Sequence, residues 1–282
     1  MKDMNTVKLS NGIEMPQIGY GVYQVDPAEC ERCVSDALKV GYRMIDTAQA
    51  YHNEEGVGAA VAKSGIRREE LFIVSKVWIS NYGYEKAKSS IEESLRKLGT
   101  DYIDLMLLHQ PFCDRYGAYR ALEDEYREGK LRAIGVSNFY PDHLIDLANN
   151  VSIPPMVNQV ETHVFDQQIE AHRYMEELGC RIMSWGPLAG GRNGFFTNPV
   201  LETIGRKYGK SVAQVALRWL LQRGVIVIPK TVHIDRMKQN LDILDFTLND
   251  SDMAEIAGLD TGKSLFFDHH DPETVKMFMS WR

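Results

Sequence analysis

Apolar residues follow two alternating patterns along this chain. Short runs rich in aliphatic and β-branched residues alternate with longer stretches in which apolar residues recur about every 3.6 positions. The first pattern predicts buried parallel strands, and the second predicts amphipathic helices packed against them. The predicted strands are residues 44–46, 71–76, 103–109, 133–137, 156–161, 181–186, 225–229 and 241–244.

The predicted helices fill the intervals between these strands. They include residues 84–98, 116–128, 142–148, 167–178, 212–222 and 250–256, and several end at glycine. Eight strand–helix units predict an α/β fold, a (β/α)8 TIM barrel. An N-terminal β-hairpin is expected before the barrel, because Asn11-Gly12 is a strong turn signal between residues 6–9 and 13–15.

An open doubly wound sheet is the alternative α/β arrangement. It would normally carry a Gly-x-Gly-x-x-Gly turn after its first strand. Gly19-Tyr20-Gly21 begins like such a turn, but Gln24 occupies the position of the third glycine. A nicotinamide cofactor would therefore have to be held in another way. The glycine-rich segment 188–198 is predicted to fold over a ligand.

Length and composition favour one domain that spans residues 1–282, since 44% of the residues are hydrophobic and barrels of about 250 residues commonly form one unit. A net charge of −7 argues against a general nucleic-acid or anionic-membrane surface. The start of the chain lacks a signal-peptide pattern, and no run approaches about 18 apolar residues, so we expect a cytoplasmic protein.

Cys30 and Cys33 form a Cys-x-x-Cys spacing that can indicate redox chemistry or a zinc site. However, Asp26 and Pro27 have the pattern of a helix start, and both cysteines share the apolar face of that helix. We therefore predict that they belong to the core.

Four polar residues, Asp46, Tyr51, Lys76 and His109, lie at or just after the ends of strand-like runs. If these strands run parallel in a barrel, the four side chains meet at one rim. An ammonium group beside Tyr51 is expected to lower its pKa from the ordinary value of about 10. Asp46 would orient Lys76, and neutral His109 could donate a hydrogen bond to a carbonyl oxygen. Together they would protonate a carbonyl group.

The sequence also allows three other interpretations. Lys76 could form a Schiff base, as in a (β/α)8 aldolase or lyase. The chain could also be a non-catalytic protein that senses a cofactor. Finally, His269 and His270 lie between two aspartates, a pattern that can indicate a metal site. Because adjacent histidines point apart and the sequence indicates no third ligand, we predict no metal site.

Three segments, residues 41–54, 131–139 and 228–240, resemble the signature blocks of the aldo-keto reductase family. The resemblance extends over nearly the whole chain. It implies NADPH-dependent reduction of aldehydes and ketones to alcohols, with Asp46, Tyr51, Lys76 and His109 as the catalytic residues and Tyr51 as the proton donor.

The same resemblance implies a cofactor site. Ser137, Asn138 and Gln159 would hold the nicotinamide carboxamide, Trp185 would stack on the ring, and backbone of residues 188–191 would cover the pyrophosphate. Lys230, Thr231 and Arg236 would bind a 2′-phosphate, which favours NADPH over NADH. The other predicted cofactor contacts are Gly21, Val22, Gly186, Pro187, Leu188, Gly190, Val232, Gln239 and Asn240.

Predicted substrate contacts are Tyr23, Trp78, His109 and Gln110. Gln110 stands where many family members have tryptophan, so the substrate pocket loses one aromatic wall. Trp185 and the tail 266–272 resemble the bacterial branch that includes 2,5-diketo-D-gluconate reductases. Small dicarbonyls, aromatic aldehydes and keto-sugar acids are all compatible with this pocket. We expect a monomer without a nucleic-acid or membrane partner.

Overall fold

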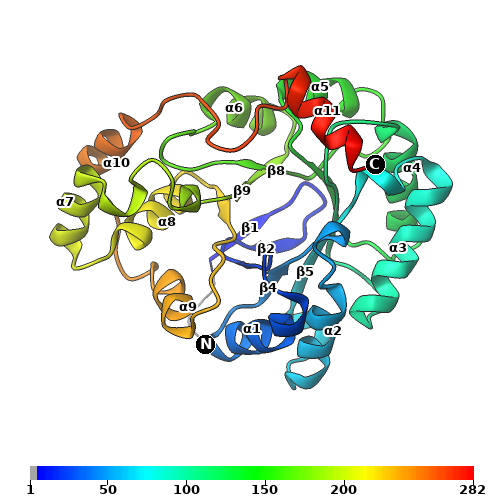
Figure 1. Ribbon diagram of the computed structural model, residues 1–282, viewed down its shortest axis with the longest axis horizontal. Coiled ribbons are helices and arrows are strands. Elements are labelled where there is room, and N and C mark those ends of the chain that lie inside the picture. The colour runs from blue at the N-terminus through cyan, green and yellow to red at the C-terminus, as the bar shows by residue number, and fades with distance from the viewer. Residues whose placement is uncertain (1–4) are drawn as a thin grey trace.

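The computed structural model describes residues 5–282 and contains one eight-stranded parallel sheet at its centre (Figure 1). The strands follow one another in chain order around the sheet. Backbone hydrogen bonds from Gly19 N to Val227 O (2.8 Å) and from Val227 N to Gln17 O (2.9 Å) join the last strand to the first. The predicted (β/α)8 barrel is therefore confirmed. The strands are β3 (Tyr20–Gly21), β4 (Met44–Asp46), β5 (Phe72–Val77), β6 (Leu105–Leu108), β7 (Ile134–Ser137), β8 (Val157–Glu161), β9 (Arg181–Trp185) and β10 (Ile226–Val227).

Helices surround the sheet as an outer ring (Figure 1). They are α1 (Pro27–Val40), α2 (Glu54–Lys63), α3 (Tyr84–Leu98), α4 (Arg115–Arg127), α5 (Pro141–Ala148), α6 (Ile169–Glu177), α7 (Pro199–Tyr208), α8 (Val212–Gln222), α9 (Ile234–Leu241), α10 (Asp250–Ala257) and α11 (Pro272–Ser280). Helix α1 begins as predicted, because Asp26 accepts a hydrogen bond from Ala28 N at 2.9 Å and Pro27 follows it. Cys30 and Cys33 are fully buried. Their predicted place in the core is confirmed.

The predicted hairpin is present as β1 (Thr6–Lys8) paired antiparallel with β2 (Glu14–Pro16). It lies across the amino-terminal end of the barrel. Asn11 donates to Arg132 O at 2.9 Å, and Arg181 donates to Lys8 O at 3.0 Å, next to the starts of β7 and β9. The hairpin thus covers one end of the barrel, and the carboxyl ends of the strands face the other end.

The predicted strand 241–244 is wrong. Leu241 ends α9, and the backbone N–H of Asp242 closes that helix instead of joining the sheet. The missing barrel strand is β3, whose residues sequence reasoning compared with a dinucleotide-binding turn and did not predict as a strand. A Cβ atom on Gly21 would lie 2.9 Å from Ile228 O, and one on Gly19 would lie 2.5 Å from Met44 Cε. The two glycines allow β3 to pack closely between β4 and the chain after β10.

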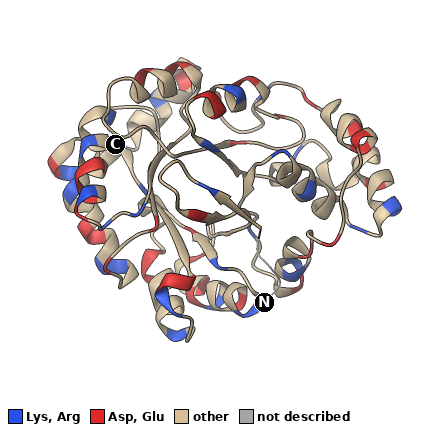
Figure 2. Cartoon of the chain, turned by 180° about the vertical axis from the view of Figure 1, so that it is seen from behind, with Lys and Arg blue, Asp and Glu red and all other residues tan. Residues whose placement is uncertain are grey.

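Acidic and basic residues are interspersed over the outer helices (Figure 2). Within residues 5–282, no helix combines the length and apolarity needed to cross a membrane. A group of buried polar side chains, including Asp46, Lys76 and Gln159, lies near the carboxyl ends of the strands. These buried polar groups mark the candidate site.

Candidate active site

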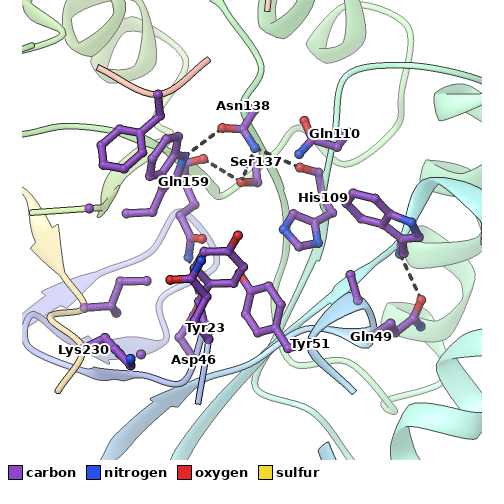
Figure 3. Close-up of a pocket in the computed structure, with 18 of the residues that line it drawn as sticks. Tyr23, Asp46, Gln49, Tyr51, His109, Gln110, Ser137, Asn138, Gln159 and Lys230 are labelled. Carbon is purple, nitrogen blue, oxygen red and sulfur yellow. Dashed lines mark hydrogen bonds between the residues drawn. The ribbon is translucent and has the colours of Figure 1, made fainter. Parts of the chain in front are cut away.

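A cavity of about 1040 Å³ opens at the carboxyl ends of the strands (Figure 3). Asp46, Tyr51 and His109 line it, whereas Lys76 lies beneath its floor with no exposed surface. Asp46 ends β4, and Lys76 lies in β5. Tyr51 ends the short 3-10 helix η1 (Gln49–Tyr51), which the chain forms directly after β4. The structure therefore brings together the four residues that the strand ends predicted.

Lys76 has a hydrogen-bond partner for each of its three ammonium protons. Its Nζ atom lies 2.6 Å from Asp46 Oδ1, 2.9 Å from Thr47 O and 3.3 Å from the Tyr51 hydroxyl. Gln159 donates to the second carboxylate oxygen of Asp46 at 2.8 Å. A buried ion pair is stable only when its remaining hydrogen-bonding groups are satisfied in this way. The network fixes a positive charge beside the Tyr51 hydroxyl.

The expectation that Lys76 lowers the pKa of Tyr51 is wrong for this structure. Burial raises the pKa of Tyr51 well above its ordinary value, and the neighbouring Asp46 and Tyr23 raise it further. Burial also lowers the pKa of Lys76, while Asp46 opposes that effect. The loss of hydration on burial thus has a larger effect on the pKa of Tyr51 than the nearby ammonium group has. Tyr51 is held in its protonated form.

His109 follows β6 and forms the neighbouring part of the cavity wall. Its ring lies 5.6 Å from that of Tyr51 and 5.0 Å from that of Trp78, measured between centroids. Burial lowers the pKa of His109 well below its ordinary value, and the charge of Lys76 adds to the effect. The predicted neutral imidazole is confirmed. Its Nδ1 atom is buried without a hydrogen-bond partner, so this ring has unused hydrogen-bonding capacity.

A chain of polar side chains extends along the cavity from β7 to β9. Ser137 donates to Gln159 O at 2.8 Å, Asn138 donates to His109 O at 3.0 Å, and Trp185 Nε1 donates to Asn138 Oδ1 at 2.8 Å (Figure 3). Asn138 has a φ of 64°, a conformation that asparagine tolerates better than most residues. These bonds fix the side chains that the family resemblance assigned to the nicotinamide.

The predicted cofactor residues divide into two groups. Ten of them line the cavity: Gly21, Ser137, Asn138, Gln159, Trp185, Gly186, Pro187, Leu188, Gly190 and Lys230. The other six do not line it: Val22, Thr231, Val232, Arg236, Gln239 and Asn240. Val22 is completely buried, because it belongs to the tightly packed region around β3. The remaining five lie in or just before α9, beyond Lys230 at the cavity edge.

Lys230 and Arg236 are both exposed, and neither has an ion-pair partner among the described residues. By contrast, Lys238 on the same helix lies 3.9 Å from Asp235. Two unpaired cations next to the start of α9 are suited to an anionic group.

The predicted substrate residues Tyr23, Trp78, His109 and Gln110 all line the cavity. Sequence reasoning missed a second wall, which the C-terminal tail supplies through Phe266, Phe267, His269, Phe278 and Trp281. Trp281 stacks on Trp78 with ring centroids 6.4 Å apart, and His269 bonds to Gln110 Oε1 at 2.9 Å. The high aromatic content of residues 266–281 was the available signal.

The glycine-rich segment lies at the edge of the cavity, beside Phe266 of this tail wall. It contains two short 3-10 helices, η4 (Ala189–Gly191) and η5 (Phe195–Thr197). The Arg192 guanidinium lies 4.0 Å above the Phe266 ring, and that ring also packs against Trp185 at 5.2 Å. Leu188, Gly190 and Arg192 line the cavity, so this segment is in position to contact a bound molecule.

Schiff-base chemistry does not fit the position of Lys76. Its amine has no exposed surface, and all three of its protons are engaged. A substrate in the cavity meets Tyr51 before it meets this nitrogen. The arrangement suits proton transfer from Tyr51 to a carbonyl oxygen beside His109.

Comparisons with known proteins agree with this geometry. The model of the Aldo/keto reductase family matches residues 8–261. A glyoxal reductase of Bacillus subtilis (strain 168) is 49% identical over 257 residues, covering 90% of this chain and 92% of the relative. A methylglyoxal reductase of Escherichia coli (strain K12) is 41% identical over 268 residues, covering 94% and 97%.

Solved structures that resemble this fold are also aldo-keto reductases. An aldo-keto reductase enzyme from a Medee basin deep-sea metagenome library has a TM-score of 0.92 and 43% identity, covering 94% of this chain and 98% of that chain. The Bombyx mori aldo-keto reductase in complex with NADP has a TM-score of 0.90 and 31% identity, covering 98% of both chains. This chain is a member of the aldo/keto reductase family and an oxidoreductase that acts on carbonyl groups.

Proposed function

We propose that this protein reduces small dicarbonyl compounds to hydroxycarbonyl products with NADPH, and that Tyr51 donates the proton. The observation that carries this proposal is the Lys76 ammonium, buried against Asp46 and 3.3 Å from the Tyr51 hydroxyl at the cavity floor. The hydride for the carbonyl carbon comes from NADPH when that cofactor is bound. The protein then has to supply one proton to the carbonyl oxygen.

Tyr51 is suited to deliver that proton because burial keeps its hydroxyl protonated. As the proton leaves, the phenolate acquires a negative charge beside the Lys76 ammonium. The attraction between the phenolate and the Lys76 ammonium develops as the negative charge forms. It therefore stabilises the transition state more than the resting state. Neutral His109 orients the carbonyl oxygen through a ring N–H. Asp46 keeps Lys76 in place.

The cavity fits a nicotinamide cofactor. Trp185 offers a flat ring at one wall, and Ser137, Asn138 and Gln159 hold amide and hydroxyl groups in fixed positions around it. Gly186 and Gly190, with φ of 63° and 58°, bring the backbone close to this wall. We assign the 2′-phosphate to Lys230, Thr231 and Arg236, and the adenine to Gln239 and Asn240.

The dicarbonyl class follows from the cavity and from the relatives. Tyr23, Trp78 and Trp281 line the cavity with aromatic rings, while Gln110 replaces the bulk of a further aromatic ring with a polar side chain. The two bacterial relatives are named glyoxal and methylglyoxal reductases. Aromatic aldehydes and keto-sugar acids are the other candidate substrates. We further propose a single-domain, cytoplasmic monomer without a nucleic-acid or membrane partner.

The test is NADPH oxidation with glyoxal, methylglyoxal, an aromatic aldehyde and 2,5-diketo-D-gluconate. Tyr51→Phe removes only the hydroxyl, so turnover should fall by about 10²-fold or more. NADPH affinity, followed by quenching of tryptophan fluorescence, should stay nearly unchanged because Tyr51 holds no predicted cofactor contact. Turnover that survives in Tyr51→Phe would refute the proton-donor role. A wild type that binds NADPH and reduces none of these compounds would favour the cofactor-sensing alternative.

A further inference from the structure

Asp142, His143 and His270 form a cluster outside the catalytic cavity. Asp142 and His143 lie in the first turn of α5, and His270 lies in the tail just before α11; these two helices are neighbours in Figure 1. One nitrogen or oxygen atom from each side chain lies within 4.8 Å of the others. His270 Nε2 lies 3.4 Å from Asp142 Oδ1, and His143 Nε2 lies 3.9 Å from Asp142 Oδ2. It is the single group of this kind among residues 5–282.

The adjacent histidines of the tail point in different directions, as the sequence indicated. His269 is buried and bonds to Gln110 inside the molecule. The rings of His270 and Tyr140 are perpendicular with centroids 4.5 Å apart, and the His270 side chain remains 55% exposed. The sequence indicated no third ligand near these histidines. The fold supplies two additional ligands, because it brings α5 against the tail.

Two imidazole nitrogens and one carboxylate oxygen are the donor set of many zinc sites. Three protein ligands leave one position for water. We propose that Asp142, His143 and His270 bind a divalent transition-metal ion such as Zn²⁺, which tethers the C-terminal tail to α5. Small side-chain rotations would bring the ligand atoms to coordination distance, because all three groups are at least partly exposed.

Arg115 competes with this metal ion for His143. Its Nη1 atom lies 2.7 Å from His143 Nδ1. An arginine can only donate, so Nδ1 accepts and the ring proton of neutral His143 is on Nε2. Metal binding at Nε2 requires this proton to move to Nδ1 and the Arg115 hydrogen bond to break. Released Arg115 keeps its bonds to Asp146 Oδ2 and Pro111 O, both at 2.9 Å.

The tether has a consequence for the tail. Helix α11 begins two residues after His270, and it carries Phe278 and precedes Trp281, both of which line the cavity. A bound ion would restrain this wall. Metal affinity and tail mobility are measurable without NADPH or a carbonyl, so this inference stands or falls independently of the proposed function.

The first experiment is calorimetric titration of the tag-free protein with ZnCl₂ at pH 7.5. We expect one site, and a decrease in affinity of about tenfold or more in His270→Gln, His143→Gln and Asp142→Asn. His172→Gln is the matched control, since His172 lies on α6 beside Glu176 at 3.6 Å. Arg115→Gln should strengthen binding, because it removes both the competing donor and a positive charge.

The second measurement is hydrogen exchange of residues 271–282 with and without zinc. Exchange should slow in the wild type and stay unchanged in His270→Gln. Equal affinity of the wild type and His270→Gln would overturn the site, as would an equal loss in His172→Gln. Weaker binding in Arg115→Gln would overturn the assigned coordination of His143. Thermal melts followed by circular dichroism check that every variant is folded.

Discussion

At the scale of single residues, the most unusual group is the Lys76 ammonium inside an apolar barrel. Burying a charge is costly unless it is paired and its hydrogen bonds are satisfied. Asp46, Thr47 O and Tyr51 satisfy all three protons of Lys76, and Gln159 satisfies the second oxygen of Asp46. The barrel thus holds the positive charge of Lys76 in a fixed position, next to the Tyr51 hydroxyl on the cavity side.

Lys76→Met should destabilise the fold by about 3–5 kcal/mol, because it leaves the Asp46 carboxylate buried and unpaired. Adding Asp46→Asn should restore much of that stability, since the charge is then gone. Urea unfolding measures both effects. Carbonyl reduction should remain lost in the double variant, because nothing stabilises the Tyr51 phenolate. Recovery of activity together with stability would show that Lys76 is only structural.

Cofactor choice is also decided by single residues. Lys230→Met combined with Arg236→Ala should weaken NADPH binding much more than NADH binding, because only NADPH carries the 2′-phosphate. Each lost cation–phosphate contact is worth about 1.5–3 kcal/mol. Lys238→Met is the matched control, since Lys238 shares α9 but lies near Asp235. Dissociation constants for the two cofactors give the ratio; an unchanged ratio would contradict the assignment.

At the scale of elements, the barrel closes through its shortest strands. Strands β3 and β10 have two residues each, and glycines permit their approach. An element this short has no detectable period, so sequence reasoning did not identify β3 as a strand and placed the eighth strand at 241–244. Longer strands such as β5 and β6 were found, because their apolar runs suffice to identify them.

Gly21→Ala should destabilise the fold by about 1–3 kcal/mol, because the new Cβ would lie 2.9 Å from Ile228 O. Gly258→Ala is the matched control: Gly258 has helical angles of −67° and −8°, which alanine adopts readily. Denaturant midpoints of the two variants give the comparison. An equal effect at both positions would refute the close-approach argument.

At the scale of the whole molecule, the C-terminal tail connects distant parts of the barrel. His269 joins the tail to Gln110, which follows β6. Burial lowers the pKa of His269 from 6.5 to about 4. The unfolded chain therefore binds this proton more readily than the folded protein. The contribution of neutral His269 to stability is complete above about pH 6.5 and is lost as the pH falls towards 4.

Stability of the wild type should therefore fall relative to His269→Gln between pH 7 and pH 4.5. A shift from 6.5 to about 4 corresponds to roughly 3 kcal/mol. The comparison with the variant is needed because the pKa of Asp166 is raised to about 6, mainly by burial. Asp166 thus acts in the opposite sense over the same range. Parallel curves of unfolding free energy against pH would contradict the role of His269.

The sequence by itself determined the alternating elements, the barrel, the family and the positions of Asp46, Tyr51, Lys76 and His109. Local periodicity reports each long element, and parallel strands necessarily carry their end residues to one rim. Tertiary structure alone decided the closing strand β3, the aromatic tail wall, the upward shift of the Tyr51 pKa and the meeting of His270 with α5. These depend on desolvation and on contacts between residues far apart in the chain, which no local pattern records.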